Sequence, residues 1–95
     1  RAYEVMYILA PTLSAEEQTA VVDRFNELIT SMDGTVENTN RWERHALAYE
    51  IKGFRDGYYV VVTFQGTPAL EAEMDRQMKL TEHILRHMII RRDAK

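Results

Sequence analysis

The most constraining feature of this chain is the order in which its apolar residues change from the period of a β-strand to that of an α-helix. Short runs are rich in β-branched and aromatic residues, as strands are, and two longer segments space their apolar residues three and four apart, as one face of a helix requires. With 95 residues the chain is long enough for one hydrophobic core and too short for two. The expected elements are a strand at 3–9, a helix from 14 to 33, strands at 35–51 and 58–64, a helix from 67, and a strand at 84–90.

The first helix has the clearest boundaries. Ser14 followed by Glu17 matches a capping box, in which a hydroxyl and a carboxylate satisfy free N–H groups of the first turn. Asp33 and Gly34 supply the left-handed residue that ends the helix. The apolar residues between these signals form one stripe: Val21, Val22, Phe25, Leu28, Ile29 and Met32.

The middle of the chain predicts a hairpin followed by a second helix. Residues 35–51 lack helical periodicity, and we expect residues 53–57, with a glycine at each end, to form the turn that joins them to strand 58–64 in antiparallel fashion. Thr67 and Pro68 open the second helix, because proline at the first helical position loses no hydrogen bond. The buried face of this helix is expected to be Leu70, Met74 and Met78.

The order β-α-β-β-α-β predicts an α+β fold of the ferredoxin-like, split β-α-β type, as a single domain over residues 1–95. Right-handed crossovers place both helices on one face of a four-stranded antiparallel sheet and leave the other face open. Alternation along strand 3–9 turns Val5, Tyr7 and Leu9 toward the helices.

The residues on the open face are expected to bind a partner. Alternation turns Met6 and Ile8 outward on the first strand and Tyr59 and Val61 outward on the third. A face with this many apolar side chains is unfavourable in water, so it predicts an interaction surface.

Charge is distributed unevenly along the chain. Residues 1–82 carry 8 bases and 14 acids, whereas residues 83–95 carry Arg86, Arg91, Arg92 and Lys95 against Asp93. Nucleic acid is therefore expected to meet only part of the surface. The absence of cysteine excludes a disulfide scaffold and a thiol nucleophile, and the apolar run at residues 58–62 is far too short to cross a membrane.

Catalytic and metal-site motifs are weak. His83 and His87 lie four apart in or beside a strand, where that spacing separates them by about 13 Å, so we expect no metal site. His45 has Glu43 and Glu50 nearby but no accompanying nucleophile. No phosphate loop or dinucleotide motif is present. We therefore expect no catalytic residue, no cofactor and no enzymatic activity.

Two alternatives share the expected topology. RNA-recognition-motif domains stack bases on aromatic residues of the first and third strands, and residues 55–60 resemble the start of their third-strand signature. Here Val60 stands at the second aromatic position, and Tyr7 is expected to face the core. The other alternative is a ferredoxin-like regulatory domain that binds a small molecule.

The stretch Trp42-Glu43-Arg44-His45-Ala46-Leu47-Ala48-Tyr49-Glu50-Ile51-Lys52, with Gly57-Tyr58 after it, resembles the signature of the bacterial small-subunit ribosomal protein six family. The opening residues 1–4, Arg-Ala-Tyr-Glu, and the last strand, residues 85–91, are also similar to that family. Glu43 stands where the family usually has glycine, and His45 stands where it often has a base.

The resemblance implies a structural, non-catalytic role on the small ribosomal subunit of the cytoplasm or of an organelle. It implies binding of small-subunit ribosomal RNA together with ribosomal protein eighteen, as a heterodimer, during assembly of the platform. The isolated chain is also expected to be capable of self-association through its open face. The residues expected to contact RNA are Arg1, Arg44, Lys79, Arg86, Arg91 and Arg92, at strand ends or flanks of the open face.

Strict alternation would place Trp42 and Arg44 on one face of strand 35–51 and His45 and Leu47 on the other. A bulge near Glu43 would shift this register. We expect Trp42 to anchor the hairpin and the protein partner, with Arg44 near the seam between RNA and protein. The predicted partner-binding residues are thus Met6, Ile8, Trp42, Tyr59 and Val61.

Overall fold

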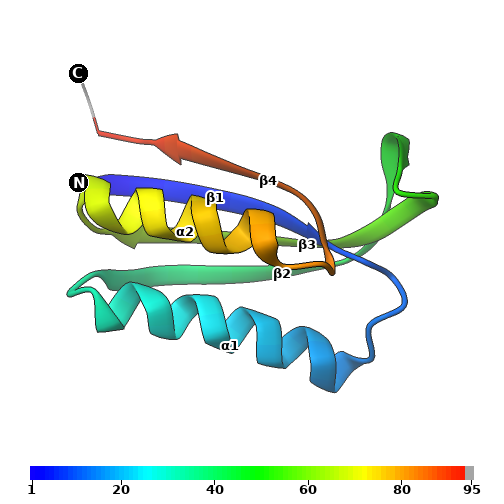
Figure 1. Ribbon diagram of the computed structural model, residues 1–95, viewed down its shortest axis with the longest axis horizontal. Helices are drawn as coiled ribbons and strands as arrows, with labels where there is room; N and C mark the ends of the chain where they lie inside the picture. The colour runs from blue at the N-terminus through cyan, green and yellow to red at the C-terminus, as the bar shows by residue number, and fades with distance from the viewer. Residues whose placement is uncertain (94–95) are drawn as a thin grey trace.

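A computed structural model describes residues 1–93 and confirms the ferredoxin-like α+β fold (Figure 1). Neighbouring strands pair antiparallel in the order β2-β3-β1-β4, so β1 is central and β2 and β4 are the edges. Lys95, which the sequence places in the basic end, lies outside the described residues. The elements are β1 (Ala2–Leu9), α1 (Ala15–Ser31), β2 (Thr35–Ile51), β3 (Phe54–Gln65), α2 (Pro68–Leu80) and β4 (Ile84–Arg91).

Both helices pack on one face of the sheet and enclose the main core with it. Central β1 contributes every second residue, and Tyr3 and Tyr7 lie against aromatic rings of β3 and α1, with centroid distances of 5.4 Å to Phe64 and 6.0 Å to Phe25. The three residues predicted as the buried face of α2 are all buried. The other fully buried residues of this core include Val5, Leu9, Ile29, Val60 and Val62.

The hairpin turn lies earlier than expected. Lys52 and Gly53 have φ of 53° and 85°, and Ile51 pairs directly with Phe54, so a two-residue turn replaces the predicted turn over 53–57. Gly57 lies inside β3 instead, where a Cβ would come within 2.6 Å of Ile8 Cγ2 and 2.8 Å of the Leu9 carbonyl oxygen. Because Gly57 has no side chain, β3 can approach β1 closely at this point. In the sequence alone, a glycine that serves such close approach looks the same as a glycine that marks a turn.

Both ends of α1 follow the expected signals. The Ser14 Oγ accepts a hydrogen bond of 3.1 Å from the Glu17 amide, and the Glu17 carboxylate accepts one of 2.8 Å from the Ser14 amide. The left-handed residue after the helix is Asp33, with φ of 65°, rather than Gly34.

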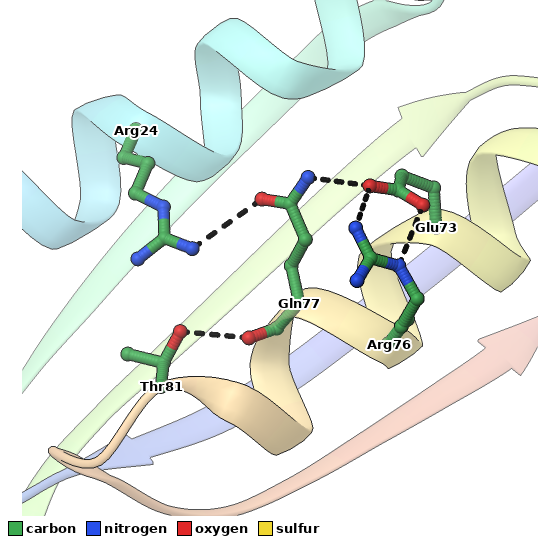
Figure 2. A network of polar contacts seen from close by, with 5 residues as sticks. All are labelled: Arg24, Glu73, Arg76, Gln77 and Thr81. Carbon is green, nitrogen blue, oxygen red and sulfur yellow. Dashed lines mark hydrogen bonds and ion pairs between the residues drawn. The ribbon is translucent and has the colours of Figure 1, made fainter.

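A polar network ties α2 to α1 on the outer side of the helical layer (Figure 2). The Glu73 carboxylate accepts hydrogen bonds from Arg76 at 2.7 and 3.0 Å and from the Gln77 amide at 2.6 Å. The Oε1 atom of the Gln77 side chain in turn accepts a bond of 3.4 Å from Arg24 of α1. The hydrogen bonds from Arg76, followed by that from Gln77, lower the pKa of Glu73 to about 2.

Replacing the cap of α1 is expected to destabilise the fold. Ser14→Ala leaves the Glu17 amide without its partner and should reduce the free energy of unfolding by about 1 kcal/mol. That corresponds to a fall in Tm of roughly 4–8 °C for a domain of this size. Thr12→Ala, in the exposed loop just before the helix, is the control. Equal melting temperatures for both variants in calorimetry would contradict a stabilising cap.

The network around Glu73 predicts a pH dependence of stability. Because its folded pKa of about 2 lies below the usual 4.5, its contribution is present above about pH 4.5 and is lost as the pH falls toward 2. The difference in unfolding free energy between the wild type and Glu73→Gln should therefore be constant at neutral pH and shrink below pH 4.5 in urea titrations. Glu27→Gln controls for removal of one exposed carboxylate from a helix. A difference that is unchanged down to pH 2 would refute the prediction.

Candidate partner- and RNA-binding face

The sheet face opposite the helices, here called the open face, carries apolar side chains from three strands. Met6 of β1 pairs with Val61 of β3 and with Met88 of β4, which places all three side chains on the same side. Met88 and Ile90 are 42% and 44% exposed. Neither residue is among the predicted partner-binding residues, although the alternation of Arg86, Met88 and Ile90 along the strand indicates an exposed apolar stripe.

Ile8 is not accessible on this face, contrary to expectation. Its side chain points away from the helices but is only 3% exposed, because the end of the β2–β3 hairpin folds over it. A second, smaller core forms there from Ile8, Ala10 and Leu85 with Leu47, Ile51, Phe54 and Tyr59. Figure 1 shows this end of the hairpin turning from the line of β3 toward the side of β4.

β2 carries a bulge beside Trp42. Arg41 pairs with Val60 and Arg44 with Tyr58, so three steps on β2 match two on β3. The extra residue moves Arg44 to the helix side and brings His45 to the face that Trp42 shares with Tyr59, so strict alternation does not hold here. The bulge lies around Glu43, the position at which the sequence left room for one.

The three rings form a compact cluster. The Trp42 and Tyr59 rings stack with centroids 5.7 Å apart and an interplanar angle of 15°, and His45 meets both rings edge-on. Trp42 remains 48% exposed. The lone tryptophan is thus held by its own hairpin and still exposes half of its indole surface.

A pocket of about 170 Å³ opens at the hairpin end of the open face. Arg86 lies on its wall and donates a hydrogen bond of 2.5 Å to the Tyr49 hydroxyl oxygen, with the guanidinium 6.0 Å from the centre of the Tyr49 ring. Its apolar lining includes Met6, Ile8, Leu47, Ile51 and Tyr59.

The six residues predicted to contact RNA do not form one patch. Arg1, Arg91 and Arg92 meet at one end of the sheet, where the Arg92 amide donates to the Ala2 carbonyl oxygen at 2.7 Å. Arg92 forms an ion pair of 2.7 Å with Glu4, and Arg91 forms one of 3.2 Å with Asp93. This end is called the arginine corner below.

Arg44 and Lys79 do not flank the open face as predicted. Arg44 pairs in register with Tyr58, on the helix side of the hairpin, and its guanidinium binds Asp56 at 2.9 Å. The hydrogen bonds and charge of Asp56 raise the pKa of Arg44. Lys79 lies on α2 and forms an ion pair of 3.0 Å with Asp75.

The histidines have structural partners. His87 faces the helices and its Nε2 lies 2.7 Å from Asp75 Oδ1, which links β4 to α2. His83 lies just before β4, and no group of three or more potential metal ligands occurs within residues 1–93. No helix within those residues is long and apolar enough to cross a membrane.

These features define a ferredoxin-like α+β protein whose candidate site is an exposed binding face. The family model for ribosomal protein S6 matches residues 2–91, and the chain therefore belongs to the ribosomal protein S6 family. The family is a structural rather than a catalytic class, and the chain is a structural protein of the small ribosomal subunit.

Individual relatives agree over nearly the whole chain. The small ribosomal subunit protein bS6 of Desulforudis audaxviator is 48% identical over 93 residues, covering 98% of this chain and 99% of the relative. The bS6 of Moorella thermoacetica is 43% identical over 91 residues, covering 96% of this chain and 93% of the relative. The crystal structure of 30S ribosomal protein S6 from Thermotoga maritima superposes with a TM-score of 0.91 at 32% identity, covering 97% of this chain and 87% of that one.

The stack of Trp42 on Tyr59 is expected to stabilise the hairpin measurably. Trp42→Ala and Tyr59→Ala, alone and combined, should show a coupling of about 0.5–1.5 kcal/mol in the free energy of unfolding, because the stacked rings are in direct contact. Trp42→Ala with Tyr49→Ala is the control pair, since Tyr49 contacts Arg86 instead. Denaturant titrations in which both pairs behave additively would show that the stack contributes nothing.

Proposed function

We propose that this chain binds small-subunit ribosomal RNA together with ribosomal protein eighteen, as a heterodimer, and acts without catalysis or cofactor in assembly of the platform on the bacterial ribosome. The observation that carries the proposal is the open face. It exposes Trp42, Met88 and Ile90 on a protein that has net charge −3. Such a face needs a protein partner to exclude water, and an acidic chain needs a partner's positive charge to approach RNA.

The partner surface proposed here combines the accessible predicted residues with those that the fold adds. Met6, Tyr59 and Val61 are partly buried in the free chain and line the middle of the face. Aromatic residues and methionine are enriched at the cores of protein interfaces, which fits this composition. Ile8 would support the surface from beneath rather than touch the partner. The full set is Met6, Trp42, Tyr59, Val61, Met88 and Ile90.

The RNA contacts are proposed to centre on the arginine corner. Arg1, Arg91 and Arg92 lie together there, and Arg91 and Arg92 are each held by one carboxylate in an exposed ion pair. Surface ion pairs of this kind are worth only about 0–1 kcal/mol, so phosphates can compete for these guanidinium groups. Arg44 and Lys79 would reach RNA only from the helix side.

Base stacking on the sheet by a stand-alone RNA-recognition domain is less well supported. Tyr7 and Val60 occupy the positions where such domains present aromatic rings, and both are buried under the helices. The aromatic rings on the open face instead pack on one another in the hairpin.

The test is a titration of small-subunit ribosomal RNA fragments with this chain, with and without ribosomal protein eighteen, at two salt concentrations. We expect tight, salt-sensitive binding only with the partner. The double variant Arg91→Gln/Arg92→Gln should weaken binding and reduce the slope of log K against log salt by about 2, since each phosphate contact contributes about 0.9.

Arg76→Gln, on α2 away from the arginine corner, is the matched control for loss of a guanidinium. Absence of RNA binding in the presence of the partner would reject the proposal. Binding of equal strength without the partner would favour a stand-alone RNA-binding module, and stabilisation by a small molecule without RNA binding would favour a regulatory domain.

A further inference from the structure

The pocket at the hairpin end of the open face has two features that a flat interface does not require. It is hollowed between the β2–β3 hairpin and the sheet, and it carries one arginine on an otherwise apolar wall. We infer that this pocket holds a single aromatic or branched aliphatic side chain of the protein partner, and that a carboxylate beside that side chain pairs with Arg86. The inference rests on the proposed function, because it assumes that a protein partner covers this face.

The size of the pocket limits its occupant. A cavity of about 150 Å³ lined by apolar side chains is known to hold one benzene molecule, and this pocket measures about 170 Å³. One phenyl or isobutyl group therefore fits within it, and a larger ligand would extend out of it. Buried anchors of this kind account for much of the binding energy at protein interfaces.

The charge of the pocket indicates what lies next to the anchor. Arg86 forms no ion pair with any carboxylate within residues 1–93, whereas Arg44, Lys79, Arg91 and Arg92 each have one. Its polar contact is with Tyr49, whose hydroxyl oxygen accepts from the guanidinium. The Tyr49 O–H is thus left to donate outward. A carboxylate at the rim would receive charge-assisted hydrogen bonds from Arg86 and a second donor from Tyr49.

An RNA ligand fits this pocket poorly, although the sequence analysis grouped Arg86 with the RNA contacts. A phosphate has no apolar group to fill the cavity. A nucleobase would place its polar edges against Met6, Ile8 and Leu47, where those edges would lose hydrogen bonds to water. A peptide segment with an apolar residue next to Asp or Glu would fill the apolar pocket and also pair with Arg86.

The experiment is calorimetric titration of ribosomal protein eighteen into the full chain and its variants. Arg86→Gln should weaken binding at least tenfold, because it leaves the partner's carboxylate desolvated and without a charged donor. Arg76→Gln, an exposed arginine on α2 that pairs with Glu73 and belongs to neither proposed binding surface, should change binding less than twofold. Arg86 is exposed, so both variants are expected to fold, and thermal unfolding checks this.

A double-mutant cycle then identifies the occupant. In ribosomal protein eighteen, each Asp or Glu that has an apolar neighbour is replaced by Asn or Gln. Each of these partner variants is then titrated against both the wild-type chain and Arg86→Gln. One such change should weaken binding to the wild type about tenfold and have little further effect on Arg86→Gln. Truncating the apolar neighbour of that acid to alanine should also lose at least tenfold.

The outcomes separate the two proposals. If the wild-type chain does not bind ribosomal protein eighteen at all, the proposed function fails. If it binds and Arg86→Gln behaves like Arg76→Gln, only the anchor pocket is wrong. The pocket assignment is also overturned if Arg86→Gln weakens RNA binding by the preformed heterodimer without affecting partner binding, or if sedimentation shows that it abolishes self-association of the chain alone.

Discussion

Two helices can cover only one face of the four-stranded sheet, and this geometric limit shapes the rest of the molecule. The helices bury the odd-numbered residues of β1, such as Val5 and Tyr7, together with the even-numbered residues of β3. The intervening residues necessarily point to the other side. There the apolar surface is covered only where the β2–β3 hairpin folds back, and Met88 and Ile90 stay exposed.

The β2–β3 hairpin makes the surface of the open face uneven. Its two-residue turn at Lys52 and Gly53 extends the strands beyond the end of β1, and its tip then packs on Ile8 and Leu85. The bulge beside Glu43 brings His45 to the face on which Trp42 stacks on Tyr59. The face therefore has an aromatic cluster and a hollow rather than a uniform apolar surface, and these are the features by which a partner would be oriented.

The distribution of charge is consistent with a protein that shares its RNA contacts. Several exposed cations among residues 1–93 are held by carboxylates of the same chain, as Arg44 is by Asp56. The arginine corner differs from the other basic groups because it brings three arginines to one end of the sheet. Arg86 differs because it faces a pocket without a counterion among the described residues. We propose RNA as the ligand of the first and protein as the ligand of the second.

The sequence by itself determined the order of elements, the cap of α1, the buried faces of both helices and the family, because these depend on local spacing and local hydrogen bonds. It also indicated most of the open face, since alternation along β1 and β3 is strictly local. Only the tertiary structure decided that Ile8 is covered, that Gly57 serves close approach rather than a turn, and that Arg44 lies on the helix side. Those outcomes depend on how the hairpin bends and where its register shifts, and such positions are set by contacts between segments distant in sequence.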